Sequence, residues 1–162
     1  MNADNTHGRK LRAVVRLLVP SNSGETRLWF WLVVHQTQPE LVRAASRMGR
    51  PTDADTAGLF HPAWWHPKLN NDEDYEPDRP ACGPANNYVG MIRLCRDHLT
   101  TMIVTHEAVH AALAAYRLTI MQDVQLGDDC LEHEEALAHL VGDLAGQVFS
   151  VLQVARETVK VG

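Results

Sequence analysis

The sequence has few cysteines and no long apolar run. These two features argue against a disulfide-stabilised secreted protein and against a membrane-spanning protein. Its 162 residues include three cysteines, Cys82, Cys95 and Cys130. Three widely spaced cysteines do not supply a disulfide framework, so we expect a reducing compartment. The longest uncharged apolar run, Leu28 to Val34, is far shorter than the roughly 18 residues of a membrane-spanning helix. The polar N-terminus argues against a signal peptide, so we expect a cytoplasmic protein without a membrane partner.

Net positive charge is confined to the first third of the chain, although the net charge of the whole is −5. Residues 1–50 carry eight Lys/Arg and three Asp/Glu, residues 51–100 carry four and eight, and residues 101–162 carry three and nine. A basic segment can contact nucleic acid, but no RNP, zinc-finger or helix-turn-helix pattern accompanies this one. Arg12 and Arg16 fit the solvent-facing side of a strand. The sequence therefore argues against a nucleic-acid partner.

The pattern of apolar and turn residues predicts a single domain of the α+β class. With 45% apolar and 22% charged residues, the composition is that of a soluble globular domain. The predicted strands are 12–19, 27–35 and 88–94, and the predicted helices are 39–48, 98–117 and 129–157, with Asp97 and Asp129 as helix caps. We expect a short twisted antiparallel or mixed sheet that packs on the two long helices.

Three parts of this domain, 1–162, differ in composition. Residues 12–49 form a predicted hairpin, with its turn at Ser21 to Gly24, and a short helix. Residues 50–87 hold six of the eight prolines, which predicts a long irregular loop. Residues 88–157 hold a predicted edge strand, suited to pair with an extended substrate, and the two long helices.

The most informative residues, His106, Glu107 and His110, form an H-E-x-x-H sequence within a predicted helix. Two histidines at i and i+4 lie on one face of a helix, so both imidazoles can reach one metal ion. Zinc hydrolases use such nitrogen ligands, a third protein ligand and an open position for water, whose proton a nearby carboxylate accepts. We therefore expect one Zn²⁺ bound by His106 and His110, with Glu107 as general base. A neighbouring face is expected to anchor the helix in the core; it comprises Met102, Val109, Leu113 and Tyr116.

A third ligand is expected from the second long helix, and Glu135 is the first choice. Ala138, Gly142 and Gly146 follow Glu135 on the same side of that helix. Because glycine is a poor helix former, this small-residue face predicts the close passage of another helix, the one that carries the two histidines. Glu134, which lies on the broader apolar stripe, is the alternative ligand.

The motif and the later segment Glu135-Ala136-Leu137-Ala138-His139-Leu140-Val141-Gly142 together resemble the gluzincin metallopeptidases, of which thermolysin is the familiar member. The resemblance covers Asn87 to about Gln147. It implies a zincin-like fold, a bound Zn²⁺ with Glu135 as third ligand, and a peptide or protein substrate. The arrangement is also similar to short H-E-x-x-H proteins of phages and mobile elements, in which a strand like Gly90 to Leu94 precedes the motif helix.

Two departures from the gluzincin pattern affect the expected catalysis. His139 stands where thermolysin-like enzymes carry an aspartate that orients a metal-bound histidine. It is therefore a candidate orienting partner, a replacement ligand or a surface residue. The downstream His or Tyr that stabilises the oxyanion in large gluzincins is missing, which leaves Tyr88, His98 and Tyr116 as candidates for that role.

These observations predict a zinc-dependent metallopeptidase-like protein that hydrolyses a peptide bond with metal-activated water. The alternative is a zincin-fold binding or regulatory module, catalytically weak or inactive, that acts on a protein partner. The missing downstream oxyanion group favours the module, whereas Glu107 favours the enzyme, because a purely structural site does not need that carboxylate. A third interpretation gives the two helices no metal at all, and zinc content separates it from the other two. The sequence specifies neither the substrate nor the oligomeric state.

Overall fold

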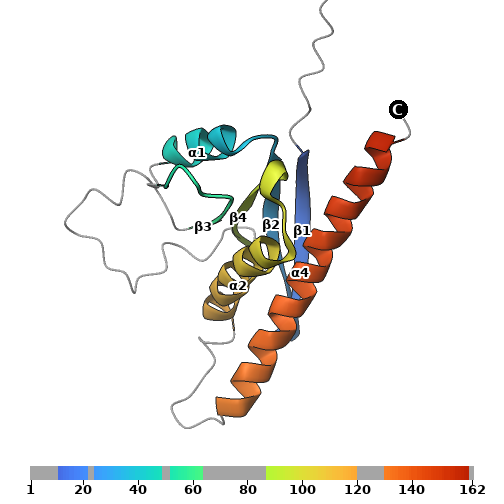
Figure 1. Ribbon diagram of the computed structural model, residues 1–162. Coiled ribbons are helices and arrows are strands. Elements are labelled where there is room, and N and C mark those ends of the chain that lie inside the picture. The colour runs from blue at the N-terminus through green and yellow to red at the C-terminus, as the bar shows by residue number, and fades with distance from the viewer. Residues whose placement is uncertain (1–10, 22–23, 49–51, 64–86, 120–129, 161–162) are drawn as a thin grey trace, which may run out of the picture.

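The computed structural model describes residues 11–21, 24–48, 52–63, 87–119 and 130–160 (Figure 1). Its elements are β1 (Leu11–Ser21), β2 (Gly24–His35), α1 (Gln38–Ser46), β3 (Gly58–Pro62), β4 (Tyr88–Cys95), the 3₁₀ turn η1 (Arg96–His98), α2 (Thr101–Leu118) and α4 (Cys130–Lys160). Four of these are the strands of one mixed sheet. The predicted α+β class is confirmed. Of the two predicted kinds of sheet, antiparallel and mixed, the structure has the mixed one.

The sheet has the strand order β1-β2-β4-β3. β1 and β2 pair antiparallel, with Val15 opposite Phe30, which confirms the predicted hairpin. β4 runs parallel to β2 and antiparallel to β3. The prediction that residues 88–94 form an edge strand is wrong, because β4 lies between β2 and β3. Six of its eight residues are buried, as is typical of an internal strand covered on both faces.

β3 is a short edge strand inside the segment that the sequence predicts as an irregular loop. Its five residues end in a proline and do not alternate apolar and polar, so the usual strand pattern is absent. β3 approaches β4 closely, since a Cβ atom on Gly90 would collide with the carbonyl oxygen of His61 and the ring of Phe60. Glycine at position 90 therefore permits the pairing. Residues 64–86 of the predicted loop lie outside the described residues.

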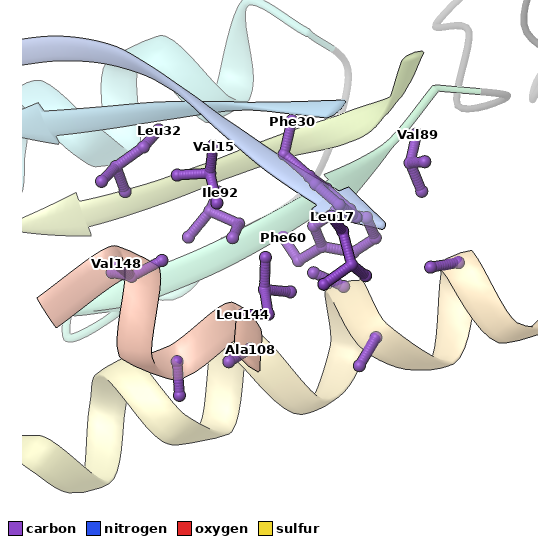
Figure 2. Close-up of a cluster of buried hydrophobic side chains, with 14 of the residues drawn as sticks. Val15, Leu17, Phe30, Leu32, Phe60, Val89, Ile92, Ala108, Leu144 and Val148 are labelled. Carbon is purple, nitrogen blue, oxygen red and sulfur yellow. The ribbon is translucent and has the colours of Figure 1, made fainter. Parts of the chain in front are cut away.

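The main hydrophobic core lies between one face of the sheet and the helices α2 and α4 (Figure 1). In β1 and β2 every second residue points into this core, as the two-residue period of a strand requires. These residues include Val15, Leu17, Phe30 and Leu32, each at most 1% exposed. Figure 2 shows them on the side of the sheet where Leu144 of α4 and Ala108 of α2 lie. The sheet thus serves as a rigid support for both long helices.

Helix α1 packs on the opposite face of the sheet, against β2 and β4. Leu41 and Ala45 are fully buried in this contact and are not part of the main core. Arg93 of β4 is buried close to the end of α1, where it bonds to His35 Nε2 at 3.1 Å and to Met48 Sδ at 2.9 Å. The two faces of the sheet therefore differ: one carries the apolar core and the other includes buried polar groups.

The start of α2 differs from the predicted one. The Thr100 hydroxyl accepts a hydrogen bond from the backbone N–H of Ile103 at 3.2 Å, so Thr100 caps this helix. The predicted cap, Asp97, lies instead within η1, because the extended backbone of Leu99 separates that turn from α2. The cap predicted for α4 at Asp129 lies outside the described residues.

One described segment, Glu134–Val154 of α4, is long and apolar enough to cross a membrane by length and composition alone. Its apolar side packs against α2 and β1, where Leu140, Leu144 and Val148 are at most 4% exposed. Packing within the domain covers these residues, while 22% of the segment as a whole is buried. The cytoplasmic location stays a prediction.

Candidate metal centre on helix α2

Helix α2 turns small residues toward the sheet. Ala108, Ala111, Ala112 and Ala115 are completely buried, and small side chains at a packing contact let the helix axis come close to its neighbour. Of the face predicted to anchor the helix, Tyr116 packs against the core. The prediction is wrong for Met102 and Val109, which are 76% and 36% exposed. The alanine row allows a closer fit to the sheet, which leaves these larger side chains at the surface.

His106 and His110 lie on the surface side of α2, one turn apart, as their spacing predicts. Their Nε2 atoms are 3.1 Å apart. The ring centroids are 4.7 Å apart and the ring planes are inclined by 81°. The side chains thus bring two nitrogen atoms together above the helix. Without a metal, this distance is that of a hydrogen bond in which one ring donates its N–H to the other.

The two nitrogen atoms also fit as ligands of a single zinc ion. Zn–N bonds of about 2.0–2.1 Å at tetrahedral angles hold two nitrogens roughly 3.3 Å apart, and the observed separation is 3.1 Å. A zinc site needs at least three protein ligands. Among the residues that the structure describes, no group of three His, Cys, Asp or Glu side chains converges. The described part of the chain therefore brings two candidate donors together, and zinc binding stays a prediction.

Glu107 is buried, at 5% exposure, although the histidines that flank it are exposed. It lies against β3: a Cβ atom built on Gly58 would be 2.8 Å from Cγ and 3.0 Å from Oε1 of Glu107. The absence of a side chain at Gly58 therefore leaves the space that the carboxylate fills between α2 and the edge strand. Its carboxylate is thus held against β3, and its role as general base stays a prediction.

The small-residue side of α4 does not contact α2. Cβ atoms on Gly142 and Gly146 would have no neighbour within 4 Å, and both glycines are exposed. α4 instead packs through larger apolar residues such as Leu140, Leu144 and Val148. The prediction of a close helix contact along the glycines is wrong. Burial of these larger side chains removes more apolar area from water than a contact along the glycines would. The stabilisation from that burial therefore outweighs the closer helix packing that glycine permits.

The third-ligand candidates on α4 are both exposed. Glu135 shares the open side of the helix with Gly142, and the structure does not bring it together with the histidine pair. Glu134 precedes the partly buried Leu137 and Val141 by three and seven residues, which places it beside the packed side of α4. The ligand roles of Glu135 and Glu134 therefore stay predictions. The close contact of α2 with the glycines of α4, which favoured Glu135, is not formed.

The remaining candidate residues lie on β4, η1, α2 and α4. Tyr88 stacks on Trp29 with ring centroids 4.5 Å apart, and Trp29 alternates with core residues, so both rings lie on the sheet face opposite α2. This position contradicts Tyr88 as an oxyanion stabiliser. His98 is exposed in η1, and Tyr116 packs against the core. His139 is exposed on α4. The roles of these three stay predictions.

Gly58 is a site residue that the sequence does not predict. Its contribution is the space for Glu107, and this depends on how β3 crosses α2. The available signal is weak: Gly58 opens a short apolar run that ends at Pro62, and such a run is typical of short strands. Nothing in that run indicates that the strand lies against the motif helix.

Comparisons of the chain with models of protein families, with curated proteins and with solved structures find no match. The gluzincin resemblance accordingly stays a prediction. The function proposed below depends on the residues of this chain and on their geometry.

Proposed function

We propose that the chain is a zinc-dependent metallopeptidase-like protein whose catalytic centre lies on the surface of α2. The observation that carries this proposal is the approach of His106 Nε2 and His110 Nε2 to 3.1 Å. Glu107 follows His106 directly in the same helix, and its side chain is buried against β3. Two histidines one turn apart with an adjacent glutamate are the residues that helix-borne zinc peptidase sites use.

In this proposal His106 and His110 hold the zinc ion, which when bound polarises a carbonyl and lowers the pKa of a water molecule to about 7. Glu107 accepts the proton of the attacking water and passes it to the leaving amine. Burial against β3 restricts the rotamers of Glu107, so the carboxylate is in place before the substrate arrives. A positioned general base of this kind contributes about 10²- to 10⁴-fold to the rate.

β3 is suited to hold an extended peptide substrate. It is the outermost strand on its side of the described sheet, where β4 is its one partner. The outer edge of such a strand offers backbone N–H and C=O groups to an added strand. Because Gly58 of β3 packs against Glu107, a peptide paired there would run past the general base. In this role β3 replaces the strand that the sequence favoured, residues 88–94.

The third ligand is proposed to come from the first turns of α4. The helical position of Glu134 beside the packed side favours it, and the gluzincin resemblance favours Glu135. Either carboxylate must approach α2 when zinc binds, which couples metal binding to the packing of the two helices. Chelation should therefore lower the melting temperature of the zinc-loaded protein.

A non-catalytic binding module is the second candidate. Two observations favour it: the described residues supply two zinc donors instead of three, and Tyr88 lies on the opposite face of the sheet. Such a module would keep a bound ion or a histidine pair and use the edge of β3 to hold a protein partner.

Cleavage of a peptide library by zinc-loaded protein, with zinc content measured on the same samples, tests the proposal. Glu107→Gln keeps the shape of the side chain but cannot act as a base, so it should retain zinc and lose about 10²- to 10⁴-fold in rate. Asp143→Asn, an exposed carboxylate change on α4, is the matched control and should leave both quantities unchanged. Glu134→Ala and Glu135→Ala identify the third ligand by which of them loses zinc.

Equal cleavage by wild type and Glu107→Gln at matched zinc occupancy would reject Glu107 as the base. No cleavage by either, with zinc bound, would reject the enzyme and favour the binding module. If neither α4 variant loses zinc, the third ligand does not come from Glu134 or Glu135.

A further inference from the structure

The sheet face that points away from α2 and α4 carries arginine and aromatic side chains that the zinc chemistry does not use. On β1 and β2 these residues alternate with core residues, so they lie on the opposite side of the strands. We call this group the arginine–aromatic face; it comprises Arg12, Arg16, Arg27, Trp29, Trp31 and Tyr88.

The strand register joins these residues into one surface across three strands. Arg16 on β1 pairs with Trp29 on β2, which pairs with Tyr88 on β4. The rings of Trp29 and Tyr88 are 4.5 Å apart and inclined by 37°. Trp31 packs edge-on against Trp29 at 5.9 Å, and the Arg12 guanidinium lies 3.9 Å from the centre of the Trp31 ring. Rings and guanidinium groups therefore adjoin one another along the strands.

Much of this face is accessible. The side chains of Arg12, Arg16 and Arg27 are exposed, and the rings of Trp29, Trp31 and Tyr88 are half-buried. Two apolar residues between the arginines, Val14 and Leu18, are 39% and 45% exposed. Both side chains lie on the same side of β1 as Arg12 and Arg16. Helix α1 packs on the same side of the sheet, with Leu41 and Ala45 as its buried residues.

Positive charge dominates the face, although the chain as a whole is acidic. The four described strands contain four arginines and one acidic residue, Glu25, which is the second residue of β2. The net charge of the chain is −5. Four like charges on one sheet repel one another, so their concentration there favours an anionic partner.

Arg93 adds a buried positive group whose hydrogen bonding is incomplete. It is 6% exposed, and its bonds go to His35 Nε2 and Met48 Sδ, neither of which is a carboxylate. Its Nε atom is buried without a hydrogen-bond partner in the described part of the chain. A buried charge normally has an ionic partner. Arg93 pairs with Val33, which in turn pairs with Arg12, so the two arginines lie in one row of the sheet.

Tyr88 lies within electrostatic reach of both arginines. Burial raises the pKa of the Tyr88 hydroxyl, and the positive charges of Arg93 and Arg12 partly offset this rise. Burial also lowers the pKa of Arg93. An anion bound on this face would stabilise the positive charges of the guanidinium groups.

We propose that the arginine–aromatic face binds single-stranded nucleic acid, with bases stacked on its rings and phosphates held by its arginines. Single strands are bound by sheet surfaces whose aromatic residues stack on unpaired bases, and by positive charges that follow the backbone. The linear sequence argued against such a partner because the arginines are dispersed along it and match no motif. The sheet gathers them, since strand pairing places residues from β1, β2 and β4 side by side.

Other occupants fit the same face less well. A second copy of the chain, related by a two-fold axis, would place arginines against arginines. An acidic peptide would satisfy the charges but has no group that stacks on three rings. Duplex DNA keeps its bases stacked inside, so the rings would have no partner. Single-stranded nucleic acid uses both the charges and the rings.

The test is fluorescence anisotropy with a labelled single-stranded oligonucleotide of about 12 nucleotides, titrated with the full-length protein at several salt concentrations. Trp29→Ala should weaken binding by about 5- to 100-fold. Trp29→Phe keeps a ring and should retain most of the affinity, which separates lost stacking from lost folding. Arg12→Ala and Arg16→Ala should each weaken binding and reduce the salt slope by about 0.7. Arg117→Ala, an exposed arginine on α2, is the charge-matched control and should change neither quantity.

An abasic oligonucleotide of the same length separates stacking from charge alone, since it keeps the phosphates and lacks the bases. We expect it to bind at least 10-fold more weakly. The proposal is overturned if the abasic strand or a polyglutamate peptide of equal charge binds as tightly as the normal strand. It is also overturned if Arg117→Ala weakens binding as much as Arg12→Ala, or if light scattering shows a dimer that Trp29→Ala dissociates. Absence of binding at about 50 mM salt, where such contacts are strong, would likewise reject it.

Discussion

Replacement of Gly58 by alanine tests whether Glu107 is packed against the edge strand β3. The added Cβ atom would lie 2.8 Å from Cγ of Glu107 and 2.8 Å from Cγ2 of Ile103. Carbon atoms in ordinary contact are about 3.5–4.0 Å apart. Either β3 or both side chains must therefore move by roughly 1 Å. Glu107 is buried and Ile103 is partly buried, so neither side chain can move without disturbing its neighbours.

Overpacking of this kind costs about 1–3 kcal/mol. In a domain of this size each kcal/mol lowers the melting temperature by about 2–4 °C, so Gly58→Ala should melt roughly 2–12 °C lower than wild type. Gly142→Ala is the matched control, because a Cβ atom there meets nothing within 4 Å. That change replaces glycine in a helix and should stabilise the protein by up to about 1 kcal/mol.

Urea unfolding followed by circular dichroism gives the free energy of unfolding for both variants. A double-mutant cycle adds Ile103→Ala, which removes one of the two close contacts, and the pair should show a coupling of about 0.5 kcal/mol or more. If Gly58→Ala is as stable as wild type, the reasoning about the space that Glu107 fills is refuted. The same result would remove the support for a substrate path along β3.

Three further predictions concern other parts of the fold, each measured by urea unfolding. Thr100→Ala removes the cap of α2 and should lower the free energy of unfolding by about 0.5–2 kcal/mol, whereas an unchanged value would mean that the cap is not formed. Leu144→Ala leaves a cavity where the side chain is fully buried and should cost about 2–5 kcal/mol. Burial raises the pKa of Tyr88, so the unfolded chain loses this proton at a lower pH than the folded one. Stability should therefore fall as pH rises above about 10, and Tyr88→Phe should remove that part of the decline.

The regular elements of the fold follow from local periodicity. The alternation in β1 and β2 and the alanine content of α2 were sufficient to predict two strands, their hairpin and the motif helix. β3 was not predictable in the same way, because it has five residues and depends on its pairing with β4 for its existence. The central place of β4 was also not evident, since the order of strands in a sheet is set by tertiary contacts.

The histidine pair was predictable because it depends on the geometry of one helix. The third ligand was not, because it requires knowledge of which side of α4 faces α2. The glycines suggested one side, and the larger residues around Leu144 occupy the other. Burial of large apolar side chains decided the orientation of the helix. The arginine–aromatic face was missed for a similar reason, as it combines residues from three strands.

The central claim is that His106 and His110 together hold a zinc ion, and metal analysis of the purified, zinc-loaded protein tests it most directly. The account predicts about one zinc ion per chain in wild type and in Glu107→Gln. It predicts loss of that ion in His106→Ala and in His110→Ala, with the circular dichroism of the folded chain retained. Equal zinc in wild type and in both histidine variants, or no zinc in wild type, would contradict the claim.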